Sequence, residues 1–159
     1  MKKGPVIAII VSVCLLVAML LLPITHTPTK EVITESVDQK IERAINMVTS
    51  SPSPMPGIML LREVLEEDPE NIKALSALGL FSIQSNQLVK AIARFEQIVD
   101  IDSQNYLALE KLVDLYKVTK DTINWTQSLQ NLYQVETDEE RLKRIKSTLK
   151  ELEHEFVKS

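Results

Sequence analysis

The chain has 159 residues and a net charge of −4 at pH 7; 45% of its residues are hydrophobic and 25% are charged. This length allows one soluble domain at most, and the composition is that of an ordinary globular protein. Because charges of both signs are mixed along the sequence and no basic face is evident, a nucleic-acid partner is not expected.

The first element is an uncharged apolar stretch at Val6–Leu22, VIAIIVSVCLLVAMLLL. With its flanking residues it reaches about 20 residues, or roughly 30 Å as a helix, which is enough to cross the core of a bilayer. Lys2 and Lys3 precede it, whereas only Lys30 follows at a distance, and this bias places the N-terminus in the cytoplasm. We therefore predict one transmembrane helix, an anchor at residues 1–24 that contacts the lipid bilayer and places the remaining chain on the extracytoplasmic, periplasmic side of the inner membrane.

A cleaved signal peptide is the alternative, since two lysines before an apolar core also open such a signal. Two features favour a retained anchor. The apolar run is longer than the usual signal core, and the Thr-His-Thr sequence that follows is a poor cleavage site. Residues 25–37 are predicted to form a linker, because Pro23 and Pro28 disfavour a helix that continues from the membrane.

Two similar phrases then lie 34 residues apart, LEEDPENIKAL at Leu65–Leu75 and VDIDSQNYLAL at Val99–Leu109. Pro69 cannot continue the preceding helix, and Asp68 and Asn71 can cap or turn the chain into the next one. Each phrase therefore predicts a joint between two pairs of helices.

The same register extends in both directions without an insertion and places apolar residues at equivalent positions. These residues are Ile41, Ala44, Leu61, Val64, Leu75, Leu78, Phe95, Ile98, Leu109, Leu112, Leu129 and Leu132. The pattern predicts three helix-turn-helix units at residues 38–71, 72–105 and 106–139. In this register SPSPMP, Ser51–Pro56, is the turn between the helices of the first unit and not a domain boundary.

The last predicted element is a helix at residues 140–159 with apolar residues three or four positions apart. The stripe consists of Leu142, Ile145, Leu149, Leu152 and Phe156. Because stacked repeats leave the apolar face of their last unit open, we expect this helix to cap the third unit. A dimerising coiled coil is the alternative, although the stripe is short for one.

The period, the helix pairing and the joints of residues 38–139 resemble those of the tetratricopeptide repeat (TPR) family. The second unit carries the resemblance best, at Leu75, Leu78, Gly79, Ala91, Phe95 and Ile98. In the first unit Ile45 and Gly57 stand where the family has Gly and Ala, and in the third Val113 and Trp125 do. The resemblance implies an all-α, TPR-like α-solenoid of three helix-turn-helix units plus a C-terminal capping helix.

The family resemblance also implies a module that binds a protein or peptide along the concave surface formed by the first helix of each pair. The positions carried over are Gln39, Glu42, Asn46, Lys73, Ser76, Leu80, Ile83, Leu107, Glu110, Asp114 and Lys117. Leu80 and Ile83 are apolar although they lie off the core stripe, so they predict a patch for an extended or helical partner segment. The alternatives are that the chain's own linker covers them or that they are scattered surface residues. Glu42 stands where the family's carboxylate clamp has Lys, which argues against binding of a terminal carboxylate.

No catalytic arrangement is evident, so we expect no enzyme activity, no cofactor or metal, and no small-molecule substrate. The histidines, His26 and His154, are far apart and have no cysteine or carboxylate cluster at ligand spacing. The single cysteine, Cys14, cannot form an intramolecular disulfide, and the three glycines do not form a phosphate-binding loop.

The wording GLFSIQSNQ at Gly79–Gln87 is similar to that of small membrane-anchored TPR proteins of Bacteroidetes-type bacteria. Together these features predict a membrane-anchored TPR adaptor or scaffold that mediates protein–protein interaction on the extracytoplasmic side of the inner membrane. Two alternatives stay open: a structural homo-oligomer that pairs through its repeats or C-terminal helix, and a cleaved, soluble periplasmic binding module.

Overall fold

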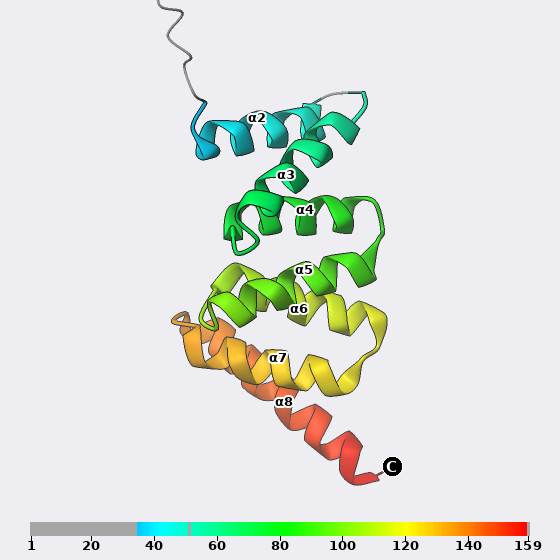
Figure 1. Cartoon of the computed structure of the whole chain (residues 1–159). Coiled ribbons are helices and arrows are strands. Elements are labelled where there is room, and N and C mark those ends of the chain that lie inside the picture. The colour runs from blue at the N-terminus through cyan, green and yellow to red at the C-terminus, as the bar shows by residue number, and fades with distance from the viewer. Residues whose placement is uncertain (1–34, 51, 159) are drawn as a thin grey trace, which may run out of the picture. The chain divides into compact units, whose positions relative to one another are not determined.

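The structure, a computed structural model, describes residues 35–50 and 52–158, with side chains described as far as residue 154. This part of the chain contains seven α-helices and no strand (Figure 1). The helices are α2 (Val37–Ser50), α3 (Met55–Glu67), α4 (Ile72–Gln84), α5 (Leu88–Ile101), α6 (Tyr106–Thr119), α7 (Thr122–Val135) and α8 (Glu139–Lys158).

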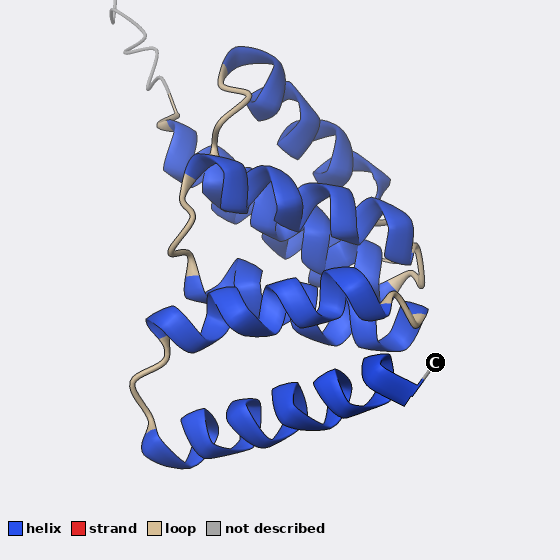
Figure 2. Ribbon diagram, turned by 90° about the horizontal axis from the view of Figure 1, so that it is seen from below, coloured by secondary structure: helices blue, strands red, loops and turns tan. Residues whose placement is uncertain are grey.

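The helices form three consecutive pairs, α2 with α3, α4 with α5 and α6 with α7, and α8 follows against α7 (Figures 1 and 2). Each pair also packs on the next one along the chain, as expected for a solenoid in which each repeat contacts only its neighbours. The predicted all-α repeat fold is confirmed for the described residues. Within the same residues, no helix is both long and apolar enough to cross a membrane. The predicted span, Val6–Leu22, lies outside the described part.

The two joints predicted from the repeated phrase have the same geometry. Asn71 and Asn105 precede α4 and α6, and their side-chain oxygens accept hydrogen bonds of 3.1 Å from the backbone N–H groups of Ala74 and Ala108. The side-chain amide of Asn71 donates to Asp68 at 3.0 Å, and that of Asn105 donates to Asp102 at 3.2 Å. The asparagines therefore cap the helices, and the aspartates hold the asparagines in place.

The turns inside the second and third pairs also repeat at the same spacing. Asn86 and Lys120 have φ angles of 55° and 60°, in the left-handed region that often ends a helix. The N–H groups of the next residues, Gln87 and Asp121, donate to carbonyl oxygens of α4 and α6 at 2.7 and 3.0 Å. The first pair is joined differently. There α3 begins at Met55 and has Pro56 in its first turn, where a missing N–H group leaves no hydrogen bond unmade.

The twelve apolar residues placed by the 34-residue register are all buried. They belong to three core clusters, and each cluster joins one helix pair to the first helix of the following pair or, at the end, to α8. Phe95 has an exposed fraction of 0% and is the largest of the fully buried side chains. Burial of a residue of this size contributes about 1.5–3 kcal/mol to folding.

The end of the stack is closed by α8. Ile145 and Leu152 are buried against Leu109, Leu129 and Leu132. Between them on α8, the polar residues Lys146, Ser147, Lys150 and Glu151 are exposed. The helix therefore covers the apolar face of the third pair and presents a polar outer side, as a terminal cap does. Phe156, the last residue of the predicted stripe, lies beyond the described side chains.

Candidate functional site

The first helices of the three pairs line an apolar groove, which we call the inner groove. Its volume is about 520 Å³. It is bounded by α2 and α4, and Leu107 of α6 closes one side. Its apolar lining consists of Ile41, Ile45, Val48, Leu61, Ile72, Ala77, Leu80, Phe81 and Leu107. An apolar hollow of this size on a repeat surface fits the side chains of a partner segment.

A second hollow of about 320 Å³ lies between α4 and α6. It shares Leu80 and Gln84 with the inner groove, so the two hollows form one band across the first helices of the pairs. Its apolar lining consists of Leu80, Ile83, Leu88, Leu115 and Val118. The band is continuous at Leu80, whose side chain has an exposed fraction of 38%.

Several residues predicted for the groove line this band. Lys73, Ser76 and Leu80 line the inner groove together with Glu42 and Leu107. Ile83 and Asp114 line the second hollow. Ile83 is half-buried and packs against a core cluster, so it supports the fold as well as the surface.

Four predicted residues lie elsewhere: Gln39, Asn46, Glu110 and Lys117 line neither hollow. Gln39 accepts a hydrogen bond from the N–H group of Ser36 at 3.0 Å, and its own N–H group donates to the Ser36 hydroxyl at 3.2 Å. This reciprocal pair is a capping box at the start of α2. Asn46 is exposed on the same helix. Lys117 Nζ lies 5.5 Å from the centroid of the Trp125 ring, a distance typical of a cation–π contact.

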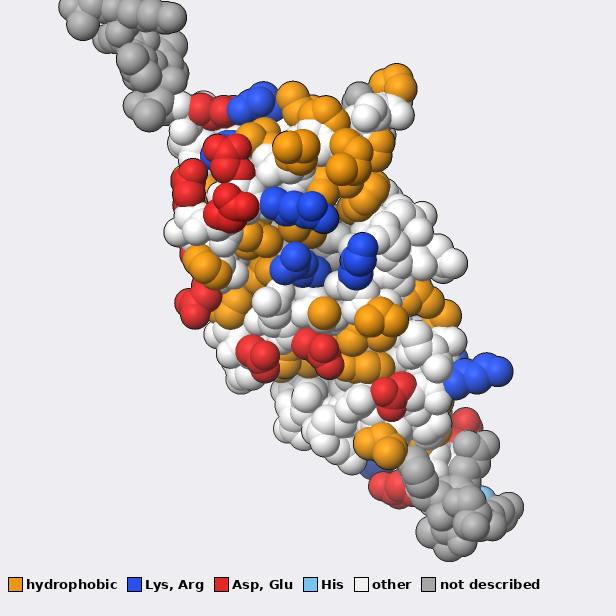
Figure 3. All heavy atoms as spheres, turned by 45° about the vertical axis from the view of Figure 1, so that its right-hand side comes forward, with side chains coloured by type: hydrophobic (Ala, Val, Ile, Leu, Met, Phe, Trp, Pro, Cys, Tyr) orange, Lys and Arg blue, Asp and Glu red, His pale blue; other side chains and the backbone are white. Residues whose placement is uncertain are grey.

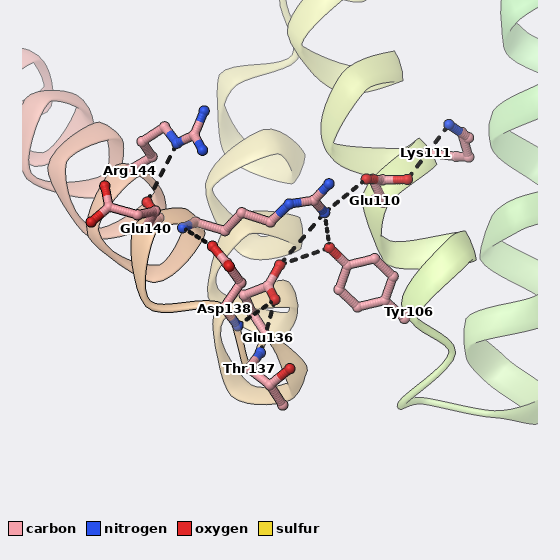
Figure 4. Close-up of polar contacts among 9 residues, drawn as sticks. Tyr106, Glu110, Lys111, Glu136, Thr137, Asp138, Glu140 and Arg144 are labelled. Carbon is pink, nitrogen blue, oxygen red and sulfur yellow. Dashed lines mark hydrogen bonds and ion pairs between the residues drawn. The ribbon is translucent and has the colours of Figure 1, made fainter.

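Glu110 takes part in a polar cluster that joins α6 to α8 (Figure 4), which we call the Tyr106 clasp. The Tyr106 hydroxyl donates to Glu136 at 2.7 Å, and Arg141 donates to the Tyr106 hydroxyl and, at 3.2 Å, to Glu110. Glu136 also accepts hydrogen bonds from the backbone N–H groups of Thr137 and Asp138 at 2.8 and 2.9 Å. The backbone N–H of Asp138, followed by the Tyr106 hydroxyl, holds the pKa of Glu136 below its ordinary value. The clasp attaches α8 to the third pair.

The rim of the band carries the carboxylates of Asp38, Glu42 and Asp114 and two lysines, Lys73 and Lys111, which are both paired. Lys73 Nζ lies 2.6 Å from Asp38 Oδ1, and this hydrogen bond raises the pKa of Lys73. Both side chains are largely exposed, so the ion pair adds little stability. Within the described residues, Glu42 and Asp114 have no hydrogen bond or ion pair of their side chains. The band therefore offers carboxylates that a basic group of a partner can neutralise.

Sequence reasoning missed several groove residues, among them Ile45, Val48 and Phe81. Ile45 was identified only as a departure from the family's Gly, but its side chain lines the groove, and Gly57 on α3 supplies the room for close helix packing. A bulky apolar residue at the family's Gly position, together with Gly in the facing helix, is the signal that could have placed Ile45 on the surface. Among the described residues, no group of His, Cys, Asp and Glu could hold a metal ion.

Comparison with known proteins supports the repeat fold. Residues 57–120 match the family model described as tetratricopeptide repeat. Among solved structures, a chain described as a mutant of MamA matches with a TM-score of 0.56 and 20% sequence identity, covering 69% of this chain and 63% of that chain. This chain thus corresponds to less than two thirds of the MamA chain, and the similarity concerns the fold alone. No match is found among curated proteins.

Proposed function

We propose that this protein is a membrane-anchored adaptor whose inner groove binds an apolar segment of a partner protein. The observation that carries the proposal is the continuous apolar band on the first helices of the pairs, lined by residues of α2, α4 and α6. Repeat proteins of the TPR type bind protein partners on this surface, and residues 57–120 match that family. No enzymatic step is part of the proposal.

The charges at the rim favour a particular partner. Glu42 lies at the inner groove and Asp114 at the second hollow, and neither carboxylate is paired within the described residues. An apolar segment flanked by Lys or Arg residues would bury its apolar side chains in the band and bring its cations to these carboxylates. A free terminal carboxylate would meet Glu42 and be repelled.

The location is proposed from the sequence. The uncharged Val6–Leu22 stretch behind two lysines supports a single-pass inner-membrane protein with a cytoplasmic N-terminus and an extracytoplasmic repeat domain. An anchor of this kind confines the groove to the membrane surface and raises the effective concentration of a bound partner.

The proposal is tested by placing carboxylates in the groove. Leu80 and Leu107 have exposed fractions of 38% and 39%, so Leu80→Glu with Leu107→Glu leaves the core intact. The double variant and the wild type are each captured with their partners from solubilised membranes. We expect the variant to capture about one tenth as much partner as the wild type, or less, because binding would now bury two carboxylates against apolar groups.

Ile123→Glu is the matched control, since Ile123 is an apolar residue of α7 with an exposed fraction of 74% that lines neither hollow. This variant should capture the partner as the wild type does. Helical content measured by circular dichroism verifies folding in each case. Equal capture by the groove variant, the control and the wild type would show that the band is not the binding surface.

A further inference from the structure

A third hollow of about 700 Å³ lies on the second helices of the first two pairs, and we call it the outer hollow. It is lined by residues of α3 and α5 and by the end of α4. On the face drawn in Figure 3, Lys and Arg side chains gather beside hydrophobic side chains. The outer hollow combines both kinds of residue, because it contains Arg62, Lys90 and Arg94 together with Met55 and Ile58.

The three cations of the outer hollow have no carboxylate partner within the described residues. Lys90 donates to the Gln87 side chain at 2.7 Å, and Arg94 donates to the Gln97 side chain at 3.0 Å; both acceptors are neutral. Arg62 makes no hydrogen bond or ion pair with any described residue. By contrast, Lys40, Arg43 and Lys73 on α2 and α4 are each paired with a carboxylate.

The two acidic residues of the outer hollow, Glu96 and Asp100, offset part of this positive charge and leave a net charge of about +1, but neither pairs with the three cations. Glu96 accepts a hydrogen bond of 2.5 Å from the Tyr116 hydroxyl, which directs its carboxylate toward α6. Asp100 is exposed and makes no ion pair within the described residues. Two guanidinium groups and an ammonium group therefore remain free to bind carboxylates, which guanidinium groups can hold through two parallel hydrogen bonds.

We propose that the outer hollow binds an acidic segment of a protein, with an apolar side chain of that segment seated against Met55, which has an exposed fraction of 52%. The cations of the hollow favour a partner that carries carboxylates, and its apolar lining favours a partner with one apolar side chain beside them. The hollow is concave, so a protruding segment fills it, whereas a flat membrane surface does not. This site shares only Phe81 with the inner groove, whose free rim charges are acidic.

The test uses the full chain in micelles of a non-ionic detergent and a set of fluorescent peptides. Each peptide has Asp and Glu on both sides of one Leu, Phe or Trp, and each has a counterpart with Asn and Gln in their place. We expect fluorescence anisotropy to give Kd values at least about tenfold lower for the best acidic peptides than for their amide counterparts. We also expect Arg62→Glu with Arg94→Glu to raise the Kd of the acidic peptides at least about tenfold, and the double change to Gln to have a smaller effect of the same sign.

Lys146→Glu with Lys150→Glu is the matched control, since both lysines are exposed on α8 and make no ion pair within the described residues. This control should leave the Kd within about twofold of the wild-type value. Leu80→Glu with Leu107→Glu should also leave the Kd of the acidic peptides unchanged. The proposal for the inner groove and the proposal for the outer hollow can therefore fail independently of each other.

Three results overturn the proposal. The first is that no acidic peptide binds more tightly than its amide counterpart. The second is that the control pair weakens binding as much as the Arg62 and Arg94 reversal does. The third is that the Arg62 and Arg94 reversal weakens binding to phosphatidylglycerol vesicles, or self-association measured by sedimentation, but leaves binding of the acidic peptides unchanged.

Discussion

At the scale of single residues, Gly57 sets how closely the first helix pair packs. A Cβ atom at this position would lie 2.4 Å from the carbonyl oxygen of Ala44 and 2.8 Å from a methyl carbon of Val48. The carbonyl belongs to the backbone of α2 and cannot move without the helix. Gly79 of α4 is tight for a different reason, because its Cβ would lie 2.9 Å from the ring of Phe95.

We therefore predict that Gly57→Ala lowers the free energy of unfolding by about 1–3 kcal/mol, the range of an overpacked helix contact. Gly79→Ala should lose less, because the outer atoms of a ring can shift and because Ala gains about 1 kcal/mol of helix propensity over Gly. Urea unfolding followed by circular dichroism measures both. A Gly57→Ala variant as stable as the wild type would mean that α2 and α3 lie farther apart than the structure has them.

The sequence predicts the core residues well and the surface residues less well, and Ile45 illustrates why. A 34-residue period identifies buried residues because every repeat must cover the next with apolar side chains. The groove depends instead on which side of each helix is left uncovered, and that follows from the packing of three helices. Ile45 and Phe81 are apolar like the core residues, so periodicity alone does not separate them from the core.

At the scale of helices and joints, the sequence predicts those features whose contacting residues are close together in the chain. Asn71 and Asn105 cap their helices as the repeated phrase predicts, because the capping bond is made within three residues. The Tyr106 clasp was not predicted, since it brings together Tyr106, Glu136 and Arg141 across the third pair and α8. A contact between such distant positions has no local sequence signal.

The clasp predicts a pH dependence that Glu136→Gln reveals. Because the folded protein holds the pKa of Glu136 below the ordinary value of 4.5, the stabilisation is complete above that value and is lost as the pH falls below it. We expect Glu136→Gln to be less stable than the wild type at about pH 7, and the difference between them to shrink as the pH falls to about 3. Urea unfolding at a series of pH values measures the difference. A difference between Glu136→Gln and the wild type that stays constant across the pH series would contradict the linkage.

At the scale of the whole repeat domain, each helix pair is stabilised by contacts with the neighbouring pairs. Each core cluster spans one pair and the next helix, so no residue of the first pair contacts the core beneath α8. In such a stack, the two ends determine whether the domain stays a monomer, because an open apolar face binds another copy. The inner groove lies on the first helices of the pairs and the outer hollow mainly on the second helices, and Phe81 is the one lining residue that they share, so the two proposed partners would meet only there.

The structure indicates that α8 caps the third pair, and the alternative is that α8 is a dimerisation helix. One substitution changes the mass of the protein in solution in opposite directions in these two cases. Ile145→Asp places a carboxylate against Leu129 and Leu132, so a capping helix would detach. The free energy of unfolding would then fall by about 2–5 kcal/mol. The apolar face of the third pair would become exposed and would promote self-association. Sedimentation equilibrium of the full chain in density-matched detergent should then give a larger mass for the variant than for the wild type. Ser147→Asp introduces the same charge on the exposed side of α8 and should leave both stability and mass unchanged. If the wild type is instead a dimer that Ile145→Asp converts to a monomer, α8 is a dimerisation helix, and the apolar face of the third pair is closed by a second copy of the chain.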